Sequence, residues 1–199
     1  MNLIKIELSE EDINRCWNFA NNIIRTSNQY DRMNAKNLTN DEKLLYRIKR
    51  TFVGKLGEMA FKNLLESRKI TVDAQGMFEI YRGAENVDSF DFLTQNNETI
   101  DIKTAVFPNH IRLVVPIDQF LSIPKTYYVG VKLELQHNVS NYLTLEKKSI
   151  KNVYICGYVS HDELNRKDTI NLREFSCKSI NLEYLHDIEE LLKILQKSE

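Results

Sequence analysis

The chain has 199 residues, of which 42% are hydrophobic and 28% are charged, and its formal net charge is −1. This composition suits one compact domain, and six Gly and three Pro exclude a collagen-like or low-complexity chain. No apolar run approaches the ~20 residues that a membrane span needs. The mixed segment 1–8 cannot serve as the apolar region of a signal peptide. We therefore expect a soluble, cytoplasmic protein without a membrane partner.

The cysteines and histidines form no recognisable pattern. The three cysteines are far apart, no CxxC pair exists, and the four histidines contain neither HxH nor HExxH. We expect reduced, mostly buried thiols and ordinary surface or core histidines.

The first part of the chain is predicted to be helical. Ser9 followed by three acidic residues is typical of a helix start. The apolar residues that follow have helical spacing: Ile13, Trp17, Ala20 and Ile24. Residues 27–38 read as a connection. Thr39 and Glu42 then form a capping box, and helix is expected from there to about residue 50 and on, with or without a break, to about residue 68.

The middle of the chain changes to the pattern of strands. Short aromatic or β-branched runs bounded by turn residues occupy 76–82, 87–94, 98–106, 127–135 and 152–159. The turn at 95–97 makes 87–106 a predicted hairpin. A short helix is expected at 116–121 and an amphipathic helix at 181–197. This order predicts an α/β fold, with a central mixed β-sheet flanked by helices and an N-terminal helical arm.

Positive charge is concentrated in one stretch. Residues 36–69 contain nine Lys or Arg against four Asp or Glu. Such a block can contact phosphates, which need local positive charge, although a charge run on a helix is more often a solvated face. The candidate DNA contacts are Arg47, Lys49, Arg50 and Lys55.

The predicted hairpin presents acidic groups from otherwise apolar strands. Side chains alternate along a strand, so Asp101 and Lys103 share one face while Ile100 and Ile102 share the other. Asp91 on the partner strand can lie across from Asp101. Facing carboxylates repel and are costly to desolvate, and Mg²⁺ removes that cost because it prefers hard oxygen ligands. Lys103 could then hold an attacking water. The alternative is an edge hairpin whose acids and lysine face water and pair with one another.

A third acid lies on the upstream helix. On a helical wheel, Glu58 is at the rim of an apolar arc that includes Gly54 and Gly57. Each glycine costs a helix roughly 1 kcal/mol relative to alanine. Close approach of the helix to the sheet would compensate, and it would bring Glu58 towards the strand acids. Alternatively, Gly54 marks a helix break and Glu58 is a surface residue.

With these residues in this order, the chain resembles the PD-(D/E)XK nuclease superfamily. The shared features are a GxxGE sequence at 54–58, then Asp91, then Asp101-x-Lys103, and the resemblance covers about residues 51–135. Members include restriction endonucleases, archaeal Holliday-junction resolvases and nucleases of phage and defence systems. The sequence departs from the family at 89–90, where a proline often precedes the first acid. Asp88 is a rival to Asp91, which it could replace only on a bulged strand.

The resemblance implies a restriction-endonuclease-like core, in which a helix precedes a three-stranded meander, a crossover helix and a further strand. It also implies that Asp91 and Asp101 bind Mg²⁺, with Mn²⁺ as a substitute. Glu58 would add a ligand directly or through water, and Lys103 would activate the water. The expected domain spans 1–199, with a helical region at 1–50, a catalytic core at 51–135 and further strands and a helix at 136–199.

The function predicted from these features is that of a metal-dependent endonuclease acting on DNA in restriction, defence, or phage or recombination processes. One alternative is a catalytically inactive nuclease fold that binds DNA or protein. Another is a two-carboxylate hydrolase such as a glycosidase, which would leave Lys103 and the basic helix unexplained. A homodimer is expected only by analogy. Nothing marks sequence specificity, and the N-terminal helices and residues 137–151 are where it would be sought.

Overall fold

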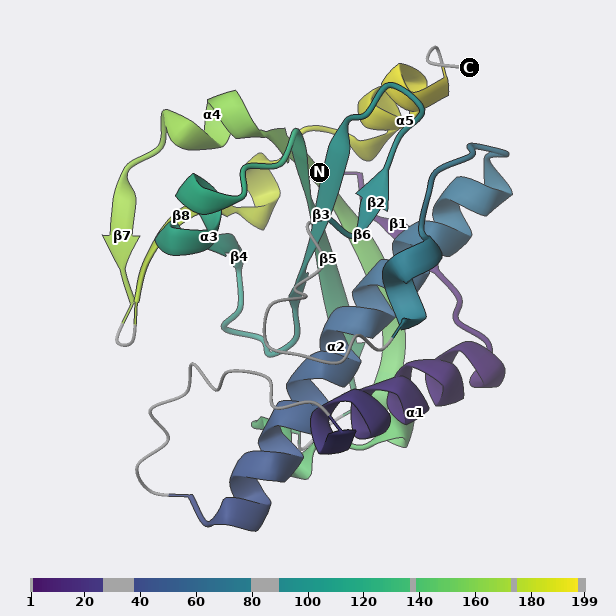
Figure 1. Ribbon diagram of the computed structural model, residues 1–199, viewed down its shortest axis with the longest axis vertical. Coiled ribbons are helices and arrows are strands. Elements are labelled where there is room, and N and C mark those ends of the chain that lie inside the picture. The colour runs from purple at the N-terminus through teal and green to yellow at the C-terminus, as the bar shows by residue number, and fades with distance from the viewer. Residues whose placement is uncertain (1, 27–37, 80–89, 137–138, 173–174, 197–199) are drawn as a thin grey trace.

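The computed structural model describes residues 2–26, 38–79, 90–136, 139–172 and 175–196. Its two long helices are α1 (Glu10–Thr26) and α2 (Asn40–Ser67), and α1 packs along α2 (Figure 1). The capping box predicted at Thr39 is present, because its hydroxyl accepts from the Glu42 backbone N–H and the Glu42 carboxylate accepts from Thr39. The helix runs through both glycines without a break, so Gly54 does not end it.

A curled, mixed five-stranded sheet lies against these helices. Its strand order is β1-β6-β5-β3-β2, with β3 and β5 parallel and the other neighbours antiparallel. The strands are β1 (Ile4–Ile6), β2 (Phe92–Leu93), β3 (Thr99–Ala105), β5 (Tyr127–Leu135) and β6 (Ile150–Ser160). The sequence predicted an α/β fold with a mixed sheet flanked by helices, and the structure confirms this fold class.

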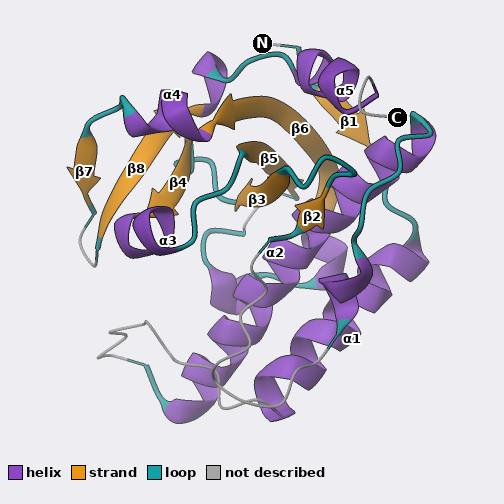
Figure 2. Ribbon diagram, turned by 45° about the horizontal axis from the view of Figure 1, so that its top comes forward, coloured by secondary structure: helices purple, strands orange, loops and turns teal. Residues whose placement is uncertain are grey.

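A second sheet of three strands continues from the first, in the order β4-β8-β7. Its strands are β4 (Arg112–Pro116), β7 (Thr169–Asn171) and β8 (Ser176–Asn181). Two short helices pack beside it, α3 (Ile117–Ser122) and α4 (His161–Asn165) (Figure 2). The last helix, α5 (Ile188–Gln196), contacts β6. Short 3-10 helices occupy Gln75–Phe78, Tyr142–Thr144, Lys147–Ser149 and Leu182–Tyr184.

Several predicted elements differ from the observed ones. The strand expected at 76–82 is wrong where the structure describes it, because Gln75–Phe78 is a 3-10 helix. Among the described residues, β2 and β3 pair, but the strand after them, β4, pairs with β8 in the second sheet, so these three strands do not form the implied meander. The predicted C-terminal helix begins later, at Ile188. Residues 27–37 of the connection predicted at 27–38 lie outside the described residues, as do residues 87–89 of the predicted hairpin, which include Asp88.

Two hydrophobic clusters hold these layers together. The larger fills the space between α1, α2, α5 and one face of the five-stranded sheet, with Phe52, Phe61 and Ile100 fully buried. The smaller joins the other face to the second sheet through residues such as Tyr128 and Val115. Alternation along β3 and β5 explains this division, because successive side chains enter opposite clusters.

A bulge produces part of the curl of the sheet. Gly130 pairs with Gly157 while Val131 pairs with Ile155, so Cys156 is an extra residue on β6. Gly157 has a φ of +143°, and a Cβ there would lie 2.3 Å from the carbonyl oxygen of His186. Only glycine fits this position.

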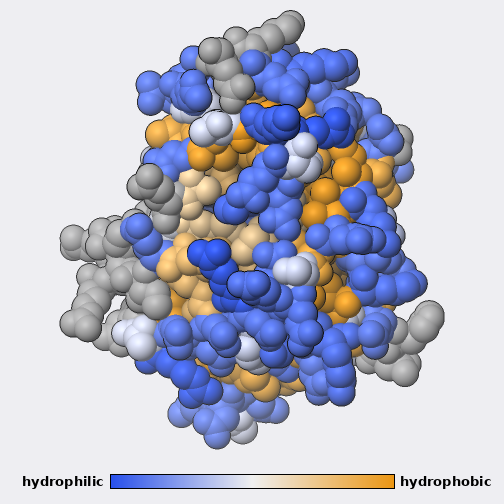
Figure 3. All heavy atoms as spheres, turned by 90° about the vertical axis from the view of Figure 1, so that its right-hand side faces the viewer, coloured by the Kyte–Doolittle hydropathy of each residue, from blue (hydrophilic) through white to orange (hydrophobic). Residues whose placement is uncertain are grey.

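The molecular surface on the right-hand side of Figure 1 is largely hydrophilic, with apolar residues visible between polar ones (Figure 3). Among the helices that the structure describes, none combines the length and the apolar character that crossing a lipid bilayer requires.

Candidate active site

The middle of α2 lies directly against β3. A Cβ built on Gly57 would lie 2.0 Å from Thr104 Oγ1 and 3.4 Å from Ile102 Cγ2, so the absence of a side chain allows the contact. The predicted close approach is confirmed at Gly57. It is wrong at Gly54, whose Cβ would meet nothing within 4 Å. Glu58 therefore leaves α2 at the point where the helix is closest to the sheet.

Asp91 lies at the open edge of β3. Its backbone N–H donates to the Ile100 carbonyl over 3.1 Å, and its Oδ2 accepts from the Ile102 N–H over 2.6 Å. Because β2 is only two residues long, Ile102 has no partner from that strand, and the carboxylate takes the place of a ladder carbonyl. This register fixes Asp91 beside Asp101, as the hairpin predicted.

Asp101 and Lys103 point away from α2, as alternation along β3 predicts. Asp101 is only 6% exposed, and Lys103 Nζ lies 2.7 Å from its Oδ2 as an ion pair. That oxygen has no aligned hydrogen-bond donor among the described residues. Lys103 Nζ also donates to Gln119 Oε1 of α3 over 3.2 Å. The lysine is therefore oriented by two groups rather than free in solvent.

Asp91 is half-buried near two other acids, Glu58 and Asp101, whose charges affect its pKa. Burial raises the pKa of the Asp91 carboxyl well above its ordinary value, and the negative charges of Glu58 and then Asp101 raise it further. The hydrogen bond from Ile102 and the charge of Lys103 offset part of this effect. Acids that share a half-buried place resist joint ionisation. Perturbed groups of this kind mark candidate functional sites.

Glu58 is balanced by a lysine one turn earlier on the same helix. Lys55 Nζ lies 2.5 Å from Glu58 Oε2, and the side chains of both residues are 11% exposed. The same ammonium lies 5.1 Å from the ring centroid of Phe19 in α1. Breaking such a buried pair by removing one partner is costly.

Two of the predicted DNA contacts do not fit that role. Lys55 is buried in its pair with Glu58, and Lys49 is 5% exposed with its Nζ donating to the Leu143 carbonyl over 2.7 Å. These ammonium groups are inside the fold, so their prediction as phosphate contacts is corrected. Arg50 is exposed and lies 6.0 Å from the ring centroid of Tyr46, and Arg47 is half-buried.

Sequence reasoning missed a further lysine at the site. Lys125, in the loop between α3 and β5, is 4% exposed, and its Nζ donates to the Ile123 carbonyl over 2.6 Å. Burial lowers its pKa, whereas the charges of Asp101 and Asp91 oppose that change. Lys125 follows a proline in a loop, and nothing in this local sequence indicates that its side chain is buried. Asp101 of β3 pairs with Tyr128 of the parallel strand β5, and the Tyr128 hydroxyl accepts from the Lys125 N–H over 3.3 Å. These two contacts bring Lys125 to the site.

The donor set suits a hard divalent cation, because it consists of carboxylates, among them that of the buried Asp101. The three acids do not close on a common point: among the described residues, no group of three or more His, Cys, Asp or Glu is arranged to hold a metal. Lys55 balances the charge of Glu58, and Lys103 balances that of Asp101.

No family model, curated protein or solved structure matches the chain. The function has to be inferred from the residues of the site.

Proposed function

We propose that the protein is a metal-dependent nuclease of the PD-(D/E)XK type that hydrolyses phosphodiester bonds in DNA. The observation that supports it best is the shared environment of Asp91, whose pKa is raised by burial and by the charges of both Glu58 and Asp101. These acids come from α2, from β3 and from the residue just before β2, and Lys103 is ion-paired with Asp101. A glycosidase would need only the acids.

Asp91 and Asp101 would hold Mg²⁺, or Mn²⁺ in its place, and Glu58 would contribute directly or through water. When bound, such a cation lowers the pKa of a water molecule and neutralises charge on the phosphate. Asp101 Oδ2 is buried and lies 2.7 Å from Lys103 Nζ, so it can act as a ligand only after this lysine shifts. Glu58 can contribute only after Lys55 releases it.

Lys103 would orient the attacking water and offset negative charge that develops on the phosphate. Its hydrogen bond to Gln119 restricts the ammonium to the side of β3 that carries Asp101. Such pre-orientation matters because a donor contributes most when it needs no rearrangement during the reaction.

Arg47 and Arg50, near the start of α2, remain the candidate contacts to the DNA backbone. Arg50 is exposed, and each phosphate contact strengthens binding in a salt-dependent way. A homodimer that reaches both strands remains part of this proposal by analogy only.

The test is incubation of supercoiled plasmid with the protein in Mg²⁺, Mn²⁺, Ca²⁺ or EDTA. We expect nicked or linear DNA with Mg²⁺ and Mn²⁺ and intact DNA with EDTA. Asp101→Asn should abolish cutting, and Lys103→Ala should lower it by orders of magnitude. Asp168→Asn, which changes an exposed aspartate far along the chain, is the matched control and should cut normally. Equal cutting by Asp101→Asn and Asp168→Asn would refute the assigned site.

A second candidate is a nuclease fold that binds DNA or protein without cutting. The observation that favours it is that Glu58 and Asp101 are each already paired with a lysine. Retention of plasmid in a binding assay, with no cleavage in either Mg²⁺ or Mn²⁺, would select this function over the first.

A further inference from the structure

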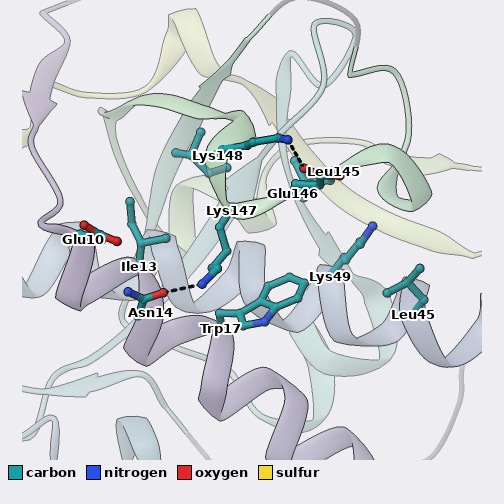
Figure 4. Close-up of a pocket in the computed structure, with 11 residues that line it drawn as sticks. Glu10, Ile13, Asn14, Trp17, Leu45, Lys49, Leu145, Glu146, Lys147 and Lys148 are labelled. Atoms are coloured by element: carbon teal, nitrogen blue, oxygen red, sulfur yellow. Dashed lines mark hydrogen bonds and ion pairs between the residues drawn. The ribbon is translucent and has the colours of Figure 1, made fainter.

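A cavity of about 700 Å³ lies between α1, the first half of α2 and the segment before β6 (Figure 4). This volume is within the usual range of small-molecule sites, about 300–1,000 Å³. Lys49, which lines it, precedes Glu58 by nine residues on α2. That spacing corresponds to about 14 Å of helix rise and half a turn, so Glu58 points away from the cavity. The cavity is separate from the candidate active site.

One side of the cavity is apolar and includes an aromatic wall. The apolar lining consists of Ile13, Trp17, Leu45, Leu145 and Ile150. Trp17 packs edge-on against Phe52, with 5.1 Å between ring centroids and an interplanar angle of 86°. This contact fixes the indole, which lies between Lys147 and Lys49 in Figure 4. A fixed indole at a cavity wall suits a planar ligand group that can stack on it.

The charged part of the lining consists of three lysines, Lys49, Lys147 and Lys148, and two acids, Glu10 and Glu146. Lys147 Nζ donates to Asn14 Oδ1 over 2.6 Å, and Lys49 Nζ donates to the Leu143 carbonyl over 2.7 Å. Both acceptors are neutral, but Lys49 is buried and the charge of Glu146 acts on it, so Lys147 is the accessible cation of the two. The third lysine, Lys148, is paired with Glu146 over 3.0 Å. An exposed cation, Lys147, next to an apolar wall favours an anionic ligand with a flat apolar body.

We propose that this cavity binds a nucleotide, with its base against Trp17 and its phosphate at Lys147. Ammonium groups bind phosphate as point charges, and an aromatic face accepts any base. A fatty acid would satisfy Lys147 but would not use a flat wall. The same chemistry is offered by a free nucleotide and by a nucleotide within a single strand. The proposal does not depend on the metal site, and loss of the nuclease assignment would leave it intact.

Trp17 is the only tryptophan in the chain, so intrinsic fluorescence reports on this cavity alone. The full-length protein is titrated in EDTA with dAMP, a short oligo(dA), deoxyadenosine, inorganic phosphate and octanoate. Excitation at the red edge of the indole band avoids absorption by adenine. We expect saturable quenching by dAMP or oligo(dA), and at least tenfold weaker binding of deoxyadenosine. Tighter binding of oligo(dA) than of dAMP would identify a single strand as the source of the nucleotide, and the reverse would identify a free nucleotide.

Lys147→Ala should weaken the nucleotide about tenfold, because a hydrogen bond to a charged group is lost. The exposed position of Lys147 makes a folding defect in this variant unexpected. Lys151→Ala is the matched control, because Lys151 lies outside the cavity and its Nζ contacts Glu134 over 2.7 Å. Any of three results would overturn the proposal: no saturable quenching by either nucleotide, octanoate binding as tightly as dAMP, or equal affinities in the two lysine variants.

Discussion

Gly57 of α2 lies so close to Thr104 of β3 that a Cβ on the glycine would come within 2.0 Å of the threonine Oγ1. That hydroxyl is buried and has no hydrogen-bond partner among the described residues. The contact therefore depends on shape alone. It determines how near Glu58 comes to the edge of β3, and it can be tested by substitution.

Alanine at the two helix glycines should have opposite effects. Gly57→Ala forces overpacking against Thr104 and should destabilise the protein by roughly 1–3 kcal/mol. Gly54→Ala meets nothing within 4 Å and should stabilise it by about 1 kcal/mol, because alanine favours helix. Urea unfolding of each variant measures both changes.

A double-mutant cycle provides the control for this pair. Thr104→Ala alone should cost little, since the hydroxyl it removes has no described partner. It should also relieve a large part of the penalty of Gly57→Ala. Additive effects of the two changes would contradict the proposed contact.

Local patterns predicted the elements that carry the site. The strand at 127–135 was predicted with the bounds that the structure has, and the alternation in β3 separated Asp101 from Ile102 correctly. These features depend on neighbouring residues, which is why periodicity detects them. The GxxGE helix was predicted to approach the sheet, and one of its glycines does so.

Long-range pairing could not be predicted in the same way. β4 and β8 are short strands that pair although more than 60 residues separate them in the chain, and no local pattern specifies that partner. The burial of Lys49, Lys55 and Lys125 was missed for a related reason. Lysine is almost never buried without a partner, and the partners here are a distant carbonyl, a helix neighbour and a loop carbonyl.

Asp91→Asn should stabilise the metal-free protein while it removes cleavage. An asparagine can still accept the hydrogen bond from Ile102, but it adds no charge beside Glu58 and Asp101. A gain on the order of 1 kcal/mol would raise Tm by roughly 2–4 °C for a domain of this size. Thermal unfolding in EDTA measures it.

The pH dependence of this gain follows from the raised pKa of Asp91. The folded protein holds the proton at pH values where the unfolded chain, with an aspartate pKa of about 3.9, has lost it. Stability of the wild type therefore declines as pH rises between these two pKa values. The advantage of Asp91→Asn should be small near pH 4 and should grow towards neutral pH. An advantage that shrinks as pH rises would show that Asp91 is not a costly buried acid.

Lys125→Met should lower the rate of DNA cleavage by about 10-fold to 100-fold, because a positive charge near Asp101 and Asp91 is lost from the region of the reacting phosphate. The same loss should lower the Mg²⁺ concentration that gives half-maximal cleavage. Lys125→Arg should restore part of the rate. A purely structural role, through the bond to the Ile123 carbonyl, would lower stability and leave the Mg²⁺ dependence unchanged.

Lys55→Met should make the stability of the protein depend on metal. The methionine keeps apolar contact with Phe19, but Glu58 loses the ammonium that lies 2.5 Å from it. Removing one partner of a buried ion pair typically costs about 3–5 kcal/mol. If Glu58 is a ligand, Mg²⁺ should recover part of this loss, since the cation replaces the missing charge. The measurement is the difference in Tm between Mg²⁺ and EDTA, which should be larger for Lys55→Met than for the wild type.

The double variant Lys55→Met/Glu58→Gln separates this effect from a general loss of packing. It removes both charges of the pair, so its stability in EDTA should return towards that of the wild type. Its Tm should gain less from Mg²⁺ than that of Lys55→Met, because an amide is a weaker ligand for Mg²⁺ than a carboxylate. Equal gains in Tm for the wild type, the single variant and the double variant would remove Glu58 from the metal site. Asp91 and Asp101 would then be the two of these three acids that are left to bind the cation.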